Sequence, residues 1–152
     1  MPNPPDTAIS PMEPRDLDSG IDFWRACELT KPQNDPAQDI KFARGSADSD
    51  ILVGKSDQRL IATVMVGHDG HRGWMYYLGV LPAHRRTGIG RAMVAAAEAW
   101  LQARGVWKVN LMVRNSNSTA LGFYERLGYD DDEVAILSRR FDDLSDQAGR
   151  SD

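Results

Sequence analysis

Residues 85–91 read Arg85-Arg86-Thr87-Gly88-Ile89-Gly90-Arg91 and lie between an apolar, strand-like run at 74–81 and a long amphipathic segment. The two glycines free the backbone to bend and let a ligand come close. The amides of a first helical turn have no partners inside the helix, and the helix dipole adds partial positive charge there. Because three arginines surround the same turn, the stretch predicts a phosphate-binding loop between a strand and a helix.

Two better-known glycine-rich loops do not fit this stretch. A P-loop ends in Gly-Lys-Ser/Thr, whereas Gly90 is followed by Arg91-Ala92. The dinucleotide-binding fingerprint needs a third glycine three positions after the second, where this chain has Met93, and an acidic residue at the end of the next strand, which is missing. The sequence therefore argues against a nucleoside triphosphatase and against a dinucleotide-dependent enzyme.

The pattern of apolar residues predicts an α/β fold around a mixed sheet. Strands are expected at 8–12, 51–54, 60–66, 74–81, 108–113 and 134–141, and helices at 17–29, 36–47, 88–104 and 118–127. Asp16 and Asp35 are expected to cap the first two helices. Gly79, inside an apolar strand, predicts a bulge or the close approach of a ligand. We expect a flexible N-terminus at 1–7, one domain over 8–141 and a polar tail at 142–152.

Composition limits the possible partners. The chain has 152 residues and a net charge of −4, without a basic tract, which argues against nucleic acid as a partner. No stretch approaches the roughly 20 apolar residues that span a bilayer, so no membrane partner is expected. With one cysteine, Cys27, and no signal-peptide pattern at its start, the chain is expected to be cytoplasmic. We predict no metal site.

A second motif follows about 30 residues after the loop: Asn117-Ser118-Thr119-Ala120-Leu121-Gly122-Phe123-Tyr124-Glu125-Arg126-Leu127-Gly128-Tyr129. In this order, Arg85-x-x-Gly88-x-Gly90 and the second motif resemble the coenzyme A loop and the Asn-x-x-Ala-x-x-Phe-Tyr-Glu-x-x-Gly-Phe/Tyr pattern of the GNAT superfamily of N-acetyltransferases. The resemblance covers roughly residues 7–141. Segments 24–40 and 67–73 resemble a small bacterial subgroup of these enzymes, which does not supply a substrate.

The resemblance implies a single-domain fold in which helices flank a mixed, mostly antiparallel sheet with splayed central strands. It implies direct transfer of an acetyl group from acetyl-CoA to an amine of a small molecule or a peptide N-terminus. A non-catalytic acyl-CoA-binding sensor or regulatory module is the alternative function. Such domains often dimerise, so a homodimer is one assembly that the resemblance allows.

The resemblance also implies which residues hold the cofactor. These are Leu78, Gly79, Val80, Arg85, Arg86, Thr87, Gly88, Ile89, Gly90, Arg91, Asn117 and Tyr124. Backbone amides of the loop would bind the pyrophosphate, and the strand around Leu78 and Val80 would pair with the pantetheine amides. Arg86 and Arg91 could instead be solvated surface charges, and Asn117 could simply start a helix.

Catalytic roles follow partly from the same resemblance. Tyr124 matches a tyrosine that protonates the departing thiolate, and an amide near Gly79 would stabilise the thioester oxygen. A general base is less defined, because no carboxylate lies in the strand at 74–81. The candidates are Asp35, Asp39, His68, Asp69, His71 and Tyr76. We expect Tyr76 to line the acceptor site and to take part in catalysis, with Asp35, Asp69 and His71 also binding the acceptor, although each of these three could be only a cap or turn residue.

The lack of an obvious base bears on the acceptor. An α-amine with a pKa near 8 is about one-tenth neutral at pH 7, whereas a lysine amine near 10.4 is neutral in roughly one of a few thousand molecules. The sequence therefore favours an α-amine or another amine of low pKa over a lysine side chain.

Overall fold

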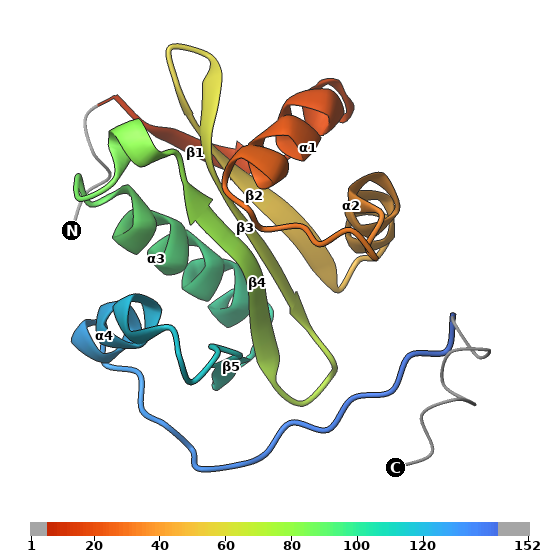
Figure 1. Cartoon of the computed structure of the whole chain (residues 1–152), viewed down its shortest axis with the longest axis vertical. Coiled ribbons are helices and arrows are strands. Elements are labelled where there is room, and N and C mark those ends of the chain that lie inside the picture. Colours follow the sequence, from red (N-terminus) through yellow and green to blue (C-terminus); the bar gives the residue numbers. More distant parts are fainter. Residues whose placement is uncertain (1–5, 143–152) are drawn as a thin grey trace. The chain divides into compact units, whose positions relative to one another are not determined.

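The computed structural model describes residues 6–142 (Figure 1). It divides into two compact parts, Met1–Arg114 and Asn115–Asp152, and each is described here by itself. Residues 1–5 of the expected flexible start and 143–152 of the expected tail lie outside the described residues. One domain over 8–141 stays a prediction.

The first part is built on a five-stranded sheet in the order β1-β2-β3-β4-β5. Strands β1 (Ala8–Pro11), β2 (Ser49–Ser56), β3 (Arg59–His68) and β4 (Gly73–Val80) pair as antiparallel neighbours. Strand β5 (Val109–Leu111) pairs in parallel with β4 and is shorter than the strand expected at 108–113. The expected mixed, mostly antiparallel sheet is confirmed.

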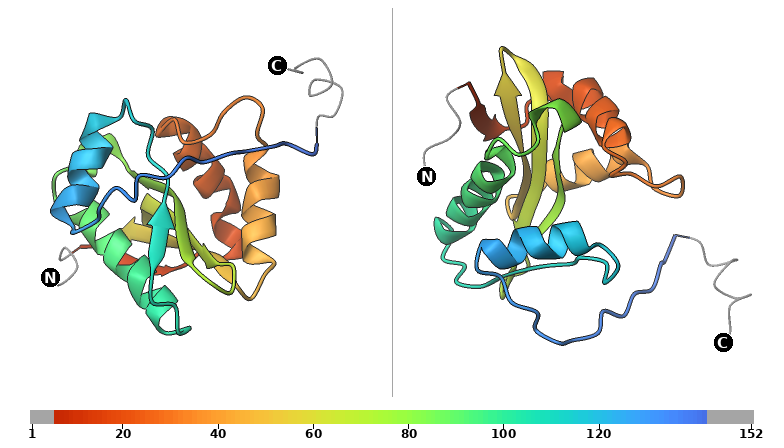
Figure 2. Two further views of the ribbon diagram at one scale, coloured as in Figure 1. Left: turned by 90° about the horizontal axis from the view of Figure 1, so that it is seen from below. Right: turned by 60° about the vertical axis from the view of Figure 1, so that its left-hand side comes forward.

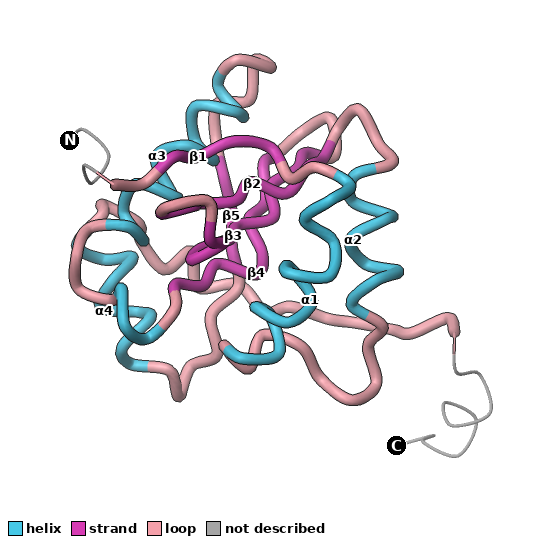
Figure 3. Tube along the Cα trace, turned by 90° about the horizontal axis from the view of Figure 1, so that it is seen from above, coloured by secondary structure: helices cyan, strands magenta, loops and turns pink. Residues whose placement is uncertain are grey.

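Helices cover both faces of this sheet. Helices α1 (Leu17–Ala26) and α2 (Pro36–Arg44) lie on one face and α3 (Ile89–Gln102) on the other, as Figures 2 and 3 show. Trp24 of α1 and Ile40 of α2 are completely buried against β2, where Ile51 and Val53 point toward them. These two helices therefore share a core with the sheet.

The starts of α1 and α2 differ in how they are capped. Asp35 accepts hydrogen bonds from the amides of Ala37 (3.1 Å) and Gln38 (3.3 Å), so its expected role as the cap of α2 is confirmed. Asp16 does not cap α1, because a 3₁₀ turn, η1 (Pro14–Asp16), comes before the helix and leaves Asp16 in a helical conformation. Its carboxylate instead accepts from the Glu13 amide (2.9 Å) and pairs with Lys55 (2.8 Å).

Strand β4 carries a bulge, but not at Gly79. Thr63 lies opposite Gly79 and Met65 lies opposite Tyr76, so Tyr77 and Leu78 together face a single residue of β3. Tyr77 has a φ of 53°, in the left-handed region. Gly79 is needed for a different reason: a Cβ there would lie 2.6 Å from Cδ1 of Leu29, in the segment that follows α1. The expected bulge is therefore present two residues earlier.

The bulge changes which face of the sheet the side chains of β4 occupy. Before it, Gly73 faces α3, since a Cβ there would lie 2.6 Å from Leu101, and the neighbouring alternation puts Tyr76 on the opposite face. After it, the Tyr77 ring stacks on Trp24 of α1, with centroids 4.0 Å apart. Two adjacent tyrosines therefore lie on the same face, which a regular strand forbids.

A pair of buried hydrogen bonds holds this bulge. The Trp24 indole Nε1 donates to Oγ1 of Thr63 (3.2 Å), and the Thr63 hydroxyl donates to the Tyr77 carbonyl (2.9 Å). Thr63 is completely buried, so the carbonyl displaced from the regular ladder obtains a partner that water could not supply there.

The second part contains α4 (Ser118–Arg126), which the Asn117 side chain caps by accepting from the Ala120 amide (3.1 Å). The strand expected at 134–141 is not formed: no described residue pairs with that segment as a strand. Leu137 is 93% exposed and Phe141 78%, so the apolar side chains that predicted the strand stay exposed in this structure.

Gly79→Ala tests the packing role of this glycine. The added methyl group meets Leu29 and the Phe23 ring, so the free energy of unfolding should fall by about 1–3 kcal/mol in urea denaturation. The matched control is Gly122→Ala in α4, where the new methyl meets only the mobile end of Arg126 and should leave stability equal or slightly higher. Equal stability of the two variants would contradict the packing role.

Candidate functional site

The loop before α3 has an open backbone at the helix N-terminus. Gly88, the residue that precedes the helix, has a φ of 88°, and no atom would lie within 4 Å of a Cβ placed on it. Arg86 also has a positive φ, of 63°. No described side chain caps α3, so the first-turn amides face an exposed loop. Such a helix start can accept an anion.

The three arginines of this loop have different surroundings. The Arg85 Nε donates to the Val80 carbonyl (3.0 Å) and also lies beside the Cys27 thiol. Burial raises the pKa of that thiol, and Arg85 opposes the rise, so Cys27 is a half-buried packing residue and not an activated nucleophile. Arg86 and Arg91 are exposed at the loop. Arg85 thus ties the loop to the end of β4.

Strand β4 offers a free edge next to this loop. Strand β5 pairs only with Gly73, Trp74 and Met75, so within the described chain the β5 side of β4 has no strand partner from Tyr76 to Val80. The expected splaying of the central strands is therefore present. The free edge includes the bulge and ends at Val80. The short turn η2 (Pro82–His84) then connects the strand to the loop.

A hollow of about 400 Å³ lies on the α1/α2 face of β4. Its lining comes from α2, the segment after it, and three strands: Asp39, Phe42, Ala43, Ser46, Ser49, Met65, Tyr76 and Tyr77. The Tyr77 hydroxyl donates to Oδ2 of Asp39 (3.0 Å). The bulge is what brings Tyr77 into this hollow together with Tyr76.

The ionisable groups of the hollow are one carboxylate and two phenols. Burial, and then the neighbouring Asp39 carboxylate, raise the pKa of Tyr77 to about 12. Burial also raises the pKa of Tyr76, with a smaller contribution from Asp69. Both phenols therefore keep their protons at neutral pH. Tyr76 lines the hollow, and its expected roles in acceptor binding and in catalysis stay predictions.

Three other expected acceptor residues lie outside the lining of the hollow. Asp35 caps α2, and His71 is exposed in the turn between β3 and β4. Asp69 closes that turn by accepting from the amides of Arg72 (2.7 Å) and His71 (2.9 Å) and from the Trp74 indole (3.2 Å). These bonds, the one from Arg72 above all, lower the pKa of Asp69 to about 2. The turn and cap roles are thus the ones with observed partners.

Sequence reasoning named Asp39 only among the base candidates and gave Tyr77 no role. Asp39 lies in the first turn of α2, where an acidic residue is usually explained by the helix dipole. The role of Tyr77 could not be predicted, because side chains of a regular strand alternate and would place Tyr77 on the face opposite to Tyr76. The register shift and the positive φ of Tyr77 mark the bulge. Gly79 predicts a bulge in this strand, but not its place at Tyr77 and Leu78.

Tyr124 and Asn117 belong to the second part of the chain. Burial raises the pKa of Tyr124 to about 12, and its ring packs edge-on against Phe123 (5.0 Å) and Tyr129 (5.5 Å). The side-chain oxygen of Asn117 is used to cap α4. The role of Asn117 as a helix start is therefore observed, and contact with a cofactor stays a prediction for both residues.

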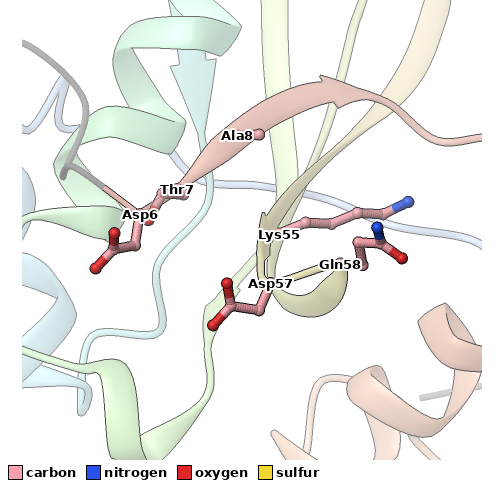
Figure 4. A pocket seen from close by; sticks show the side chains of 6 residues that line it. All are labelled: Asp6, Thr7, Ala8, Lys55, Asp57 and Gln58. Carbon is pink, nitrogen blue, oxygen red and sulfur yellow. The ribbon is translucent and has the colours of Figure 1, made fainter.

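A second hollow, of about 360 Å³, lies beside β1 and the β2–β3 turn; Asp6, Thr7, Ala8, Lys55, Asp57 and Gln58 line it. Figure 4 shows the Asp6 and Asp57 carboxylates pointing away from the Lys55 ammonium group, which pairs with Asp16. The charged groups of this second hollow therefore do not point toward a common centre. Across residues 6–142, no helix is long and apolar enough to cross a membrane, and no group of three or more His, Cys, Asp or Glu residues could hold a metal ion.

Comparison with known proteins gives this arrangement a family. The model of the acetyltransferase (GNAT) family matches residues 19–129. The chain belongs to the GNAT family of acetyltransferases. An acetyltransferase of Yersinia pestis (strain Pestoides F) is 38% identical over 125 residues, which cover 82% of this chain and 89% of that protein. A protein of Yersinia pestis bv. Antiqua, also named acetyltransferase, matches equally well.

Solved structures of other GNAT proteins share the fold. AAC(6')-Iy, in complex with the bisubstrate analogue CoA-S-monomethyl-acetylneamine, superimposes with a TM-score of 0.78 at 16% identity, covering 88% of this chain and 97% of that one. The aminoglycoside acetyltransferase meta-AAC0020 from an uncultured soil sample, in complex with sisomicin, gives 0.75 at 14% identity, covering 90% and 97%. At these identities the likeness shows the fold of the GNAT family and not the substrate.

Asp69 gives a pH-dependent prediction. The pKa of Asp69 in the folded chain, about 2, lies below its usual value of 3.8. The hydrogen bonds of the carboxylate therefore stabilise the fold above about pH 4, and this stabilisation is lost as the pH falls toward 2. Asp69→Asn, which does not titrate, should melt below the wild type at pH 7, and the gap should shrink as pH falls from 4 to 2. Melting temperatures along this series test it; a gap that does not change with pH would contradict the turn role.

Proposed function

We propose that this GNAT protein transfers an acetyl group from acetyl-CoA directly to the amine of a small molecule or of a peptide N-terminus. One observation carries the proposal: the free, bulged edge of β4 leads into an uncapped α3 N-terminus. Family membership supports acetyl transfer, and the expected acetyl-CoA motif covers the same residues.

The chain's own residues fit the donor. A diphosphate needs several amides and positive charge at one place, which the exposed loop provides through its backbone and through Arg86 and Arg91. The open space at Gly88 allows close approach of the phosphates. Arg85 contributes charge while fixing the Val80 end of the strand. The unpaired edge from Tyr76 to Val80 would hydrogen-bond the pantetheine amides.

When bound, acetyl-CoA supplies an acetyl thioester whose carbonyl carbon an amine can attack. A backbone amide at the Tyr77–Leu78 bulge, and not at Gly79, would donate to the carbonyl oxygen as charge develops on it. The C–N bond forms and the C–S bond breaks. The proton that the amine gives up passes to solvent water, and the coenzyme A thiolate leaves as an anion that solvent then protonates. Tyr124 keeps its proton, because its pKa is about 12, and donates a hydrogen bond to the leaving sulfur.

Gly90→Glu tests the loop. A carboxylate in the first turn of α3 repels the pyrophosphate, so acetyl-CoA affinity, measured by calorimetry, should fall by at least about 100-fold. Acidic residues at a helix N-terminus stabilise the helix, so the variant should fold. The control Ala95→Glu puts the same charge on the exposed side of the same helix and should bind acetyl-CoA like the wild type. Equal affinity in both variants would reject the loop as the cofactor site.

Tyr124→Phe tests the hydrogen bond to sulfur. With thiol release as the readout, kcat should fall about 10- to 100-fold while the affinity for acetyl-CoA stays within about twofold. An unchanged kcat would remove Tyr124 from the mechanism. Tight acetyl-CoA binding by the wild type without thiol release on any amine would favour the sensor function instead.

A further inference from the structure

We infer that the hollow beside β4 takes a primary amine with a single positive charge on an apolar or aromatic body, and that Asp39 holds its ammonium group. The class includes amino-acid amides and peptide N-termini with an apolar first side chain. This inference rests on the proposed function, since the hollow is taken as the acceptor side of the same reaction.

The charge of the hollow limits the charge of its ligand. Among the described residues that line it, Asp39 is the one carboxylate. Tyr77 donates to Oδ2 of that carboxylate, so the geometry fixes the side chain and leaves its other oxygen free of any described hydrogen bond. One anion matches one ammonium group. A second ammonium group in the hollow would find no second carboxylate among the described lining residues and would lose part of its hydration without a charged partner.

The walls favour an apolar body. Phe42 is 81% exposed and Tyr76 is 41% exposed, and both face the hollow together with Met65. A large aromatic side chain on the outer wall gains by covering apolar surface of a ligand. The ring faces also attract a cation that lies over them. Such a surface fits a hydrocarbon or aromatic group next to the ammonium group.

The polar groups of the hollow are few, and its two serines are already bonded locally. The Ser49 hydroxyl donates to the Ala43 carbonyl (2.7 Å), and the Ser46 hydroxyl accepts from the Asp48 amide (3.0 Å). The two tyrosines keep their protons. An aminoglycoside brings many hydroxyl groups and several ammonium groups, which this lining could not satisfy together. The hollow thus disfavours aminoglycosides, such as the sisomicin bound in one of the structural neighbours.

The proposed anchor also lies close to the proposed reaction site. Tyr77 contributes its side chain to the Asp39 hydrogen bond and its backbone to the bulge. Tyr77 therefore connects the proposed anchor to the strand along which the thioester would lie. The ammonium group held by Asp39 must give up a proton before its nitrogen can attack the thioester, and an α-amine with a pKa near 8 gives it up more readily at pH 7 than an alkylamine of high pKa.

The test uses the full chain with acetyl-CoA and measures thiol release on three probes: phenylalaninamide, phenethylamine and the aminoglycoside kanamycin. We expect kcat/KM to be highest for phenylalaninamide, lower by about 10-fold or more for phenethylamine at pH 7, and lowest for kanamycin. A preference for kanamycin would overturn the inference while leaving acetyl transfer intact.

Asp39→Asn tests whether the charge of Asp39 holds the amine. The amide oxygen still accepts from Tyr77, but the charge is lost, so kcat/KM for phenylalaninamide should fall about 10- to 100-fold, mainly through KM. The control Asp18→Asn makes the same change at an exposed position in the first turn of α1, outside the lining of the hollow, so its kinetics should match the wild type. Equal kinetics in both variants would overturn the role of Asp39.

Acetyl-CoA affinity, measured separately for each variant, distinguishes the two levels of failure. If the wild type does not bind acetyl-CoA, the proposed function fails, and the inference fails with it. If it binds acetyl-CoA and acetylates none of the three probes, the acceptor class is wrong. Unchanged acetyl-CoA affinity in Asp39→Asn, together with a raised KM for the amine, is the result that supports the anchor.

Discussion

The hydrogen bonds from the Trp24 indole through the Thr63 hydroxyl to the Tyr77 carbonyl are the interaction on which the site depends. They satisfy a carbonyl that the bulge removes from the regular ladder, in a place that water does not reach. The bulge in turn rotates β4, so that Tyr77 joins Tyr76 on the face of α1 and α2. Beyond Met75 the other edge of the strand is left unpaired by β5. The strand that carries the bulge is thus shared by both proposed halves of the site.

These two halves use different physical means. The loop before α3 is a place for negative charge, built from backbone amides, positive φ angles and arginines that are exposed to solvent. The hollow on the other side is largely apolar, with the single carboxylate of Asp39 and protonated phenols. The anionic donor would therefore bind at the positively charged loop, the cationic acceptor would bind in the hollow with its one carboxylate, and the two would meet along β4. AAC(6')-Iy and meta-AAC0020, solved structures of the same fold, are 16% and 14% identical to this chain, so fold likeness alone does not give the acceptor.

The sequence predicted the features that local chemistry decides. The Gly88 turn, the Asp35 and Asn117 caps and the start of α3 all follow from residue types at short spacing. Features that depend on distant partners were missed or misplaced. The bulge at Tyr77 depends on Thr63, the role of Asp39 depends on the bulge, and Asp16 is drawn to Lys55. The segment 134–141 has the apolar pattern of a strand but pairs with no described residue, since pattern alone does not provide a partner.

A crystal structure of the full chain with coenzyme A tests the central claim most directly, because it shows both the loop and the strand edge with the ligand present. The account predicts the pyrophosphate on the amides of residues 86–90 and the pantetheine arm along the free edge of β4 from Tyr76 to Val80, with the Tyr77 bulge retained. Coenzyme A bound elsewhere, or a β4 that loses its bulge and pairs fully with β5 when coenzyme A binds, would contradict it.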